Sequence, residues 1–249
     1  MTTEIVLIIV VGLIIGSFLN VVIYRLPALE AMLKTRSHCL SCQRRLKWYD
    51  LVPLFSFVIL SGKCRYCGKP IAFQYPLVEA LTALILLALY LYFGLEFAFF
   101  VLALLSCCLI VIFFYDLNKS LIPNDVVYVA IFLTVLNAVA LKYQILDVAL
   151  GLVIGAGGLG ILVLVSREKW MGYGDIKLGA VLGLGLGYPQ ILVALFFAFV
   201  LGSLVGGVLV ATGKKTLKDS IPFGPFLISG FYLALFFADK ILGWYWVGF

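Results

Sequence analysis

Eight apolar runs, the sixth of them short, fill most of this sequence, and they constrain the possible fold more than any other feature. About 20 helical residues cross the hydrocarbon core of a bilayer. Hydrophobic residues make up 64% of the chain and charged residues 12%, whereas soluble domains carry about 25% charged residues. We therefore predict an all-α polytopic membrane protein. The runs cover residues 4–24, 76–94, 97–115, 122–141, 146–166, 175–188, 190–211 and 223–245.

The lysines and arginines indicate how these spans are oriented, because cytoplasmic loops carry an excess of both residues. The segment 25–75 holds nine of the 18. If it is cytoplasmic, eight spans leave only Lys142 and Lys240 on the other side. We expect both termini to be extracytoplasmic. The basic surplus then reflects topology and contact with anionic membrane lipids, and not nucleic acid.

The one long polar segment contains a four-cysteine array. Cys39, Cys42, Cys64 and Cys67 have the spacing C-x2-C-x21-C-x2-C. Two such pairs about 20 residues apart are typical of tetrahedral zinc bound by four thiolates. A cytoplasmic location disfavours disulfides, and a redox-active pair would usually occur alone. We expect a structural zinc ion, which would stabilise a loop that has little core of its own.

Four of the twelve acidic residues have no simple explanation in a polar loop: Glu79, Asp116, Asp125 and Asp175. By the expected topology all four lie near the cytoplasmic face. Two carboxylates from different helices in a partly desolvated site form an aspartyl dyad, in which one activates water and the other donates a proton to the scissile carbonyl.

Asp116 and Asp175 are the pair that we favour. Asp125 falls in the first turn of a helix that begins near Pro123, where the helix dipole already explains a carboxylate. Asp116 lies at the C-terminal end of its span, where the helix dipole does not explain a carboxylate. Asp175 follows Gly172 and Gly174, and these glycines would let a substrate backbone approach closely.

A second glycine pattern has a different explanation. The sequence GAGGLG at 155–160 matches the dinucleotide fingerprint, but it lies inside an apolar run and not between a strand and a helix. We interpret these glycines as small residues that allow close helix packing.

The motifs taken together resemble the prepilin peptidases, the GxGD-type aspartic membrane proteases that process type IV pilin and pseudopilin precursors. The resemblance extends nearly end to end. It is carried by GSFLNVVIYRLP at 16–27, the four-cysteine loop, YPLVE at 75–79, D-x5-I-P-N at 116–124, MGYGDIKL at 171–178 and IPFGPFL at 221–227.

This resemblance implies an enzyme with two activities. Asp116 and Asp175 match the family's two catalytic aspartates, which remove a short basic leader after a Gly on the cytoplasmic side of the bacterial inner membrane. The four-cysteine loop is associated with members that also N-methylate the new amino terminus, using S-adenosylmethionine. Its partners would be prepilins or pseudopilins.

The resemblance also assigns supporting residues and domains. Gly172, Gly174 and Lys177 belong to one catalytic motif, and Pro123 and Asn124 to the other; Asn124 stands where the family often has Asp. Four further residues are candidates for the methyl-donor or substrate region, namely Gly16, Asn20, Arg25 and Glu79. We expect a first transmembrane helix at 1–25, the zinc-binding loop domain at 26–75 and a membrane peptidase domain at 76–249.

Two other functions are compatible with parts of the sequence. The chain could be a peptidase only, with the zinc loop a structural element. A proton-coupled transporter would use intramembrane carboxylates as a relay, but it should have acids near mid-bilayer and inverted repeats. Here the acids cluster at one face.

Overall fold

The computed structural model describes residues 2–26, 37–216 and 219–247 of the 249-residue chain, with side chains described up to residue 244. Residues 27–36 of the predicted loop therefore lie outside the described residues. Every regular element in the described ranges is helical, apart from two isolated β-bridges in the loop. The prediction of an all-α protein is confirmed. The chain divides into two compact units, residues 1–99 and 100–249.

Helices α1 (Thr2–Arg25) and α4 (Gln74–Phe93) form the framework of the first unit and pack against each other. Two glycines of α1 make this possible. A Cβ at Gly12 would lie 2.6 Å from the Cα of Ala83, and one at Gly16 would lie 2.6 Å from the Cα of Glu79. Small residues four apart allow helix backbones to approach in this way.

The loop between α1 and α4 contains a short 3₁₀ helix, η2 (Trp48–Asp50), and a short α-helix, α3 (Phe55–Ile59). Two hairpin-like turns flank them, each closed by one antiparallel bridge: His38 with Arg45, and Lys63 with Pro70. Each turn carries one of the predicted cysteine pairs, so the array predicted from spacing corresponds to two similar local structures.

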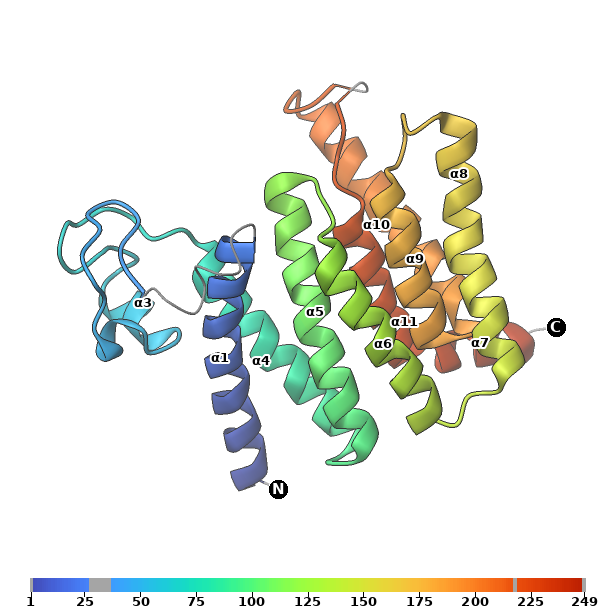
Figure 1. The fold of residues 1–249 in the computed structure, drawn as a ribbon, viewed down its shortest axis with the longest axis horizontal. Helices are drawn as coiled ribbons and strands as arrows, with labels where there is room; N and C mark the ends of the chain where they lie inside the picture. The colour runs from blue at the N-terminus through green and yellow to red at the C-terminus, as the bar shows by residue number, and fades with distance from the viewer. Residues whose placement is uncertain (1, 27–36, 217–218, 248–249) are drawn as a thin grey trace. The chain divides into compact units, whose positions relative to one another are not determined.

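The second unit is a bundle that runs up and down. Figure 1 shows the end of α5, the start of α6, the start of α9 and the start of α11 at one end of it. Its helices are α5 (Phe97–Lys119, whose first turn belongs to the first unit), α6 (Asn124–Ala140), α7 (Ile145–Leu152), α8 (Gly158–Ser166), α9 (Tyr173–Leu186), α10 (Gln190–Ala211) and α11 (Gly224–Val247). A π-helical turn, η3 (Val153–Gly157), joins α7 to α8.

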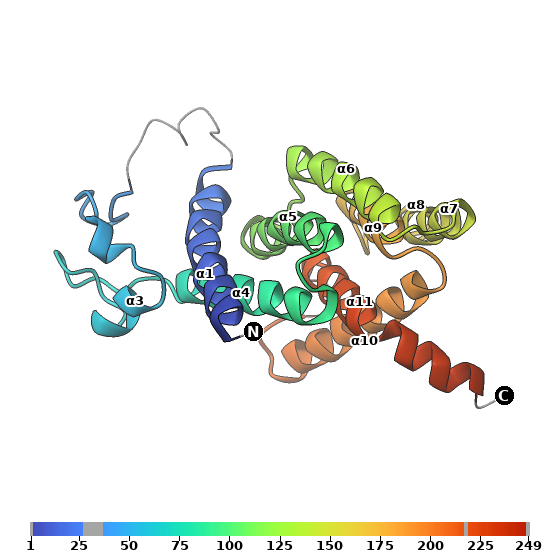
Figure 2. The same cartoon turned by 90° about the horizontal axis from the view of Figure 1, so that it is seen from below.

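Helix α9 is the central element of this unit. It contacts α6, α7, η3, α8, α10 and α11, and Figures 1 and 2 show it beside α6 and α8. Glycines explain the close approach: a Cβ at Gly155 would lie 2.3 Å from the Gly179 carbonyl oxygen, and one at Gly183 would lie 2.2 Å from that of Gly151. The packing interpretation of the glycine pattern is confirmed for Gly155, within η3.

Six helical segments in the described part of the chain are long and apolar enough to cross a membrane: α1, α4, α5, the continuous segment Ile145–Ser166, α10 and α11. They coincide with six of the eight predicted spans. The other two, 122–141 and 175–188, coincide with α6 and α9, which have 17 and 14 residues. Neither reaches the length that a membrane-crossing helix usually needs.

Candidate active site, metal cluster and cavity

Asp116 lies in the last turn of α5 and is only 4% exposed. Its Oδ2 accepts a hydrogen bond of 3.1 Å from the backbone N–H of Gly224, the first residue of α11. A helix N-terminus presents unsatisfied N–H groups and partial positive charge. The start of α11 therefore holds a carboxylate that comes from another helix.

Asp175 lies in the first turn of α9 and is 8% exposed. Its Oδ2 accepts a 3.0 Å hydrogen bond from the N–H of Gly172, while its own N–H donates to the Gly172 carbonyl at 3.1 Å. The side chain thus closes the start of its own helix. It has the same structural explanation by which the sequence set Asp125 aside.

Burial, and not position in a helix, separates the candidates. Asp125 is exposed at the start of α6. Among the described acidic residues, Glu79, Asp116 and Asp175 are buried, and outside them the Asp50 side chain in the cysteine loop is 3% exposed. Asp116 bonds to the first residue of α11, a helix that contacts α9, and Asp175 lies in the first turn of α9. The two carboxylates that the sequence paired therefore lie at the same end of this unit.

The other motif residues in this unit join α6 to α9. Lys177 Nζ donates a 2.7 Å hydrogen bond to Asn124 Oδ1, and Pro123 precedes the first turn of α6 with φ −73°. A Cβ at Gly174 would lie 3.0 Å from the Cβ of Ile122, so Gly174 is needed for packing. A Cβ at Gly172 would meet nothing closer than 3.9 Å, so Gly172 alone leaves space for an approaching chain.

Gly224 is a residue of this site that the sequence did not single out. Its motif, IPFGPFL, was used only as part of the resemblance. A Cβ at Gly224 would lie 2.6 Å from Asp116 Oδ2, so any larger residue would force the carboxylate to move. A glycine that follows a proline and an aromatic residue at the start of an apolar run was the only available signal.

The four cysteines of the loop form a cluster that can hold a metal ion. Their sulfurs all lie within 4.8 Å of one another, and Cys39 Sγ is 3.9 Å from Cys67 Sγ. Metal–sulfur bonds of about 2.3 Å in a tetrahedron separate the sulfurs by about 3.8 Å. None of the cysteines is in a disulfide. A hydrogen bond from the Cys42 N–H lowers the pKa of the Cys39 thiol to about 6, which favours the thiolate form that metals bind.

The two cysteine turns have the same backbone hydrogen bonds. Cys39 N–H donates to the Arg44 carbonyl at 3.0 Å, and Cys64 N–H donates to the Lys69 carbonyl at 2.8 Å. The residue after each pair has a positive φ: +56° at Gln43 and +69° at Gly68. The second turn has the glycine that this conformation favours, and the first does not.

Asp50 organises the loop, although its sequence context suggested only a polar loop residue. Its side chain is 3% exposed and accepts hydrogen bonds from Arg65 Nε at 2.7 Å, Tyr66 OH at 3.0 Å and the Lys47 N–H at 3.2 Å. Partial burial raises the pKa of Asp50, but these bonds outweigh it and hold the pKa below its usual range. Arg65 and Tyr66 lie between Cys64 and Cys67, so Asp50 fixes the second cysteine turn.

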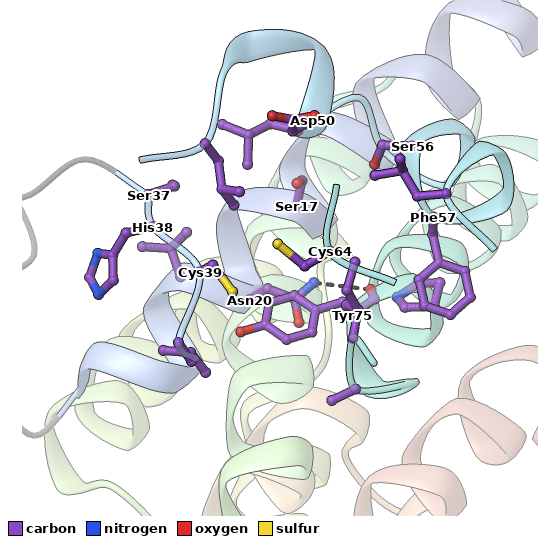
Figure 3. Close-up of a pocket in the computed structure, with 18 of the residues that line it drawn as sticks. Ser17, Asn20, Ser37, His38, Cys39, Asp50, Ser56, Phe57, Cys64 and Tyr75 are labelled. Atoms are coloured by element: carbon purple, nitrogen blue, oxygen red, sulfur yellow. Dashed lines mark hydrogen bonds between the residues drawn. The ribbon is translucent and has the colours of Figure 1, made fainter. Parts of the chain in front are cut away.

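A cavity of about 670 Å³ lies in the first unit, between α1, the start of α4 and the cysteine loop (Figure 3). Three of the four residues predicted for the methyl-donor or substrate region line it: Asn20, Arg25 and Glu79. Gly16 does not line it, and its contact with Glu79 is explained by helix packing.

Polar groups of Asn20 and an aromatic pair characterise this cavity. Asn20 is 2% exposed; its Nδ2 donates to the Tyr75 carbonyl at 3.0 Å, while its buried Oδ1 has no hydrogen-bond partner. The rings of Tyr24 and Tyr75 stack with centroids 5.7 Å apart. A buried acceptor with no partner is costly, so Asn20 Oδ1 is suited to a donor group of a bound molecule.

Both units of the chain match known protein families. Residues 10–93 match the bacterial peptidase A24 N-terminal domain, and residues 103–207 match the type IV leader peptidase family. The chain is 34% identical over 236 residues to the prepilin leader peptidase/N-methyltransferase of Bacillus subtilis (94% of each chain). It is 31% identical to that of Pseudomonas putida (93% of this chain, 90% of the relative) and 32% identical to that of Xanthomonas campestris (94% and 91%). No solved structure gives a significant match. The chain therefore belongs to the type IV leader peptidase family.

Proposed function

We propose that this chain is a membrane aspartic endopeptidase that removes the basic leader from type IV prepilins or pseudopilins and N-methylates the new amino terminus. Two buried aspartates carry the proposal: Asp116, bonded to the first residue of α11, and Asp175, in the first turn of α9. Relatives named for both activities, which align over more than nine-tenths of the chain, support it.

In the peptidase step the two aspartates act as a unit. Like charges at close range do not readily both ionise, so the pair is expected to share one proton. The ionised carboxylate takes a proton from water, which attacks the carbonyl carbon of the leader's last glycine. The protonated carboxyl donates to the carbonyl oxygen, and the tetrahedral intermediate then breaks its C–N bond as the leaving amine is protonated.

The proposed topology has eight crossings, with both termini outside and the active site at the cytoplasmic face of a bacterial inner membrane. Helix α9 would be about 21 Å long at 1.5 Å per residue, which is short for a span. Its packing against neighbouring helices on several sides supports a protein-lined position in which a shorter helix is tolerated. The eight apolar runs of the sequence support the number of crossings. The uneven distribution of its lysines and arginines supports the location of the termini and of the active site.

For methyl transfer we propose the cavity of the first unit. S-adenosylmethionine would supply a methyl group bound to a sulfonium sulfur, so that an amine could bond the methyl carbon while the neutral thioether leaves. Arg25 suits the carboxylate of such a donor, the tyrosine pair suits its aromatic base, and Asn20 Oδ1 suits an amino group. Glu79 lines the same cavity, where a carboxylate can hold the ammonium of the mature pilin and accept its proton, which leaves the free amine for methyl transfer.

The variant Asn20→Leu should separate the two activities. It removes both the unpartnered Oδ1 and the Nδ2 bond to Tyr75. Methyl transfer should therefore fall at least about 10-fold, as expected when a binding site can no longer hydrogen-bond its ligand. Leader cleavage should stay near the wild-type rate. Mass spectrometry of the pilin amino terminus, after incubation with prepilin and methyl donor, reads both products.

Asn137→Leu is the matched control. Asn137 of α6 also donates through Nδ2, to the Gly185 carbonyl at 3.3 Å, and also has a buried Oδ1 without a partner. This substitution should not lower methylation relative to cleavage. Equal loss of methylation in both variants would contradict the cavity assignment. Wild-type protein that cleaves but transfers no methyl group would establish the peptidase-only function instead.

We further propose that the metal of the four-cysteine cluster is zinc and that its role is structural. The purified protein should contain about one zinc per chain. Cys64→Ser, which replaces the one buried ligand, should lower the zinc content and make the loop sensitive to proteolysis, because metal binding and folding of such loops are coupled. Cys107→Ser, in the middle of α5, is the control and should keep the zinc. Full zinc content in Cys64→Ser would disprove the site.

A further inference from the structure

The loop contains an apolar segment that the chemistry proposed above does not use. Residues 52–60 read VPLFSFVIL and include α3. One face of α3 is open: Phe55 is 65% exposed, Val58 72% and Ile59 73%. Three adjacent large apolar side chains are unusual on a surface that faces water. This face therefore has a partner.

The segment lies beside the membrane-spanning part of α1 and α4. The backbone N–H of Leu54 donates a 2.9 Å hydrogen bond to Glu79 Oε2, and the Cα of Glu79 lies against Gly16. Gly16 is nine residues before Arg25, about 13 Å along the helix. Because α1 has 24 residues, about 36 Å, it exceeds a 30 Å hydrocarbon core by only about 6 Å. If α1 spans the whole hydrocarbon core, the Cα of Glu79 lies about 7 Å or more inside the core boundary.

Several backbone N–H groups at the turn into α3 are hydrogen-bonded. Non-helical backbone is tolerated in the hydrocarbon region only where its polar groups are paired or face protein. The N–H of Phe55 donates to the Pro53 carbonyl, that of Ser56 to Val52 and that of Val58 to Leu54. Pro53 has no N–H, and the Leu54 N–H is taken by Glu79.

The two sides of the segment differ. Ser56, Phe57 and Leu60 line the cavity, as Figure 3 shows for the first two, so the exposed face of α3 is the other side. Before the segment lie Lys47 and the 79%-exposed Trp48; after it lie Lys63 and Arg65. Tryptophan and basic residues at both ends of an apolar stretch are typical of the headgroup region, where they meet anionic lipid.

We propose that residues 52–60 are a re-entrant segment whose exposed face contacts lipid acyl chains. It enters the leaflet beside α1 and α4 and forms a lipid-embedded wall of the cavity. Glu79 accepts the hydrogen bond from the backbone N–H of its turn. The loop is then fastened to the bilayer by its own apolar segment as well as by its two flanking helices. The partner is the membrane, with anionic headgroups around Trp48 and the flanking cations.

Fluorescence quenching in nanodiscs tests this proposal. In full-length protein with Trp48, Trp170, Trp244 and Trp246 changed to Phe, a single tryptophan is introduced by Ile59→Trp, or by Phe55→Trp should the first variant not give a single size-exclusion peak. The control is Leu40→Trp, since Leu40 is 56% exposed in the first cysteine turn. The nanodiscs contain phosphatidylcholine brominated at mid-chain together with phosphatidylglycerol.

The Ile59→Trp protein should lose most of its fluorescence in brominated lipid and little with aqueous iodide. Leu40→Trp should show the opposite pattern. Iodide quenching of Ile59→Trp equal to that of Leu40→Trp would overturn the proposal, because the segment would then be in water. Protection from both quenchers would also overturn it, because protein and not lipid would then cover the face.

Discussion

Asp116→Asn and Asp175→Asn should each reduce leader cleavage by about 1,000-fold, within the range that general acid–base groups contribute. Asparagine keeps the shape and can still accept the hydrogen bonds from the Gly224 and Gly172 N–H groups. The fold should therefore persist while the proton transfers are lost. The measurement is cleavage of a prepilin by purified protein in detergent or nanodiscs, with yield and thermal stability compared with wild type.

Asp125→Asn is the matched control, because Asp125 is also an aspartate in the first turn of a helix at the same end of the bundle but is exposed. It should retain most of the activity. Cleavage by either Asp116→Asn or Asp175→Asn at the rate of Asp125→Asn would refute the dyad. Methyl transfer to a pilin that has already been cleaved should survive all three substitutions, because the proposed cavity lies in the other unit.

The sequence predicted Asp116 and Asp175 as a pair, but the structure only partly supports the argument behind that prediction. Helix-dipole reasoning set Asp125 aside, but Asp175 also lies in the first turn of its helix and closes that turn. What distinguishes it is burial by the helices around α9. Burial of one residue at the start of a short helix depends on packing between distant segments, which hydrophobic periodicity does not report.

Helix positions were predictable because the apolar runs, except the short run 175–188, are about as long as a span and are followed by polar or glycine residues. The local structure within the runs was not. The π-turn η3 interrupts the predicted span 146–166 where Gly155 packs against Gly179, and this depends on two backbones meeting. The shortness of α9 was visible in the short run 175–188, whereas α6, with 17 residues, is shorter than the predicted run 122–141.

The cysteine cluster was predictable in detail and the rest of the loop was not. Two C-x2-C pairs specify local turns that bring sulfurs together whatever the surroundings. Asp50, in contrast, received no role from the sequence. Its three hydrogen bonds come from residues up to 16 positions away, and nothing in the spacing of WYDLVP indicates them.

Gly224→Ala should lower the turnover number for leader cleavage by about 100-fold, the loss that follows a misplacement of about 1 Å at a reacting group. The new Cβ would lie 2.6 Å from Asp116 Oδ2. The atom that must move is the end of a side chain and not backbone, so the carboxylate can rotate away at little cost in stability. Because Gly224 acts through Asp116 and does not itself touch the substrate in this scheme, KM should change little.

Gly243→Ala is the matched control for this substitution, since Gly243 is in the same helix and a Cβ there would meet nothing within 4 Å. It should leave cleavage unchanged. Two readouts separate positioning of Asp116 from a general weakening of α11. The thermal stability of Gly224→Ala should match that of Gly243→Ala. The pH–rate profile of Gly224→Ala should differ from the wild-type profile, because the Asp116 carboxylate has lost the helix N-terminus that faces it. Wild-type turnover in Gly224→Ala would show that the hydrogen bond from Gly224 to Asp116 does not matter for catalysis. An equal fall in stability and activity, with an unchanged pH profile, would assign Gly224 to the fold alone.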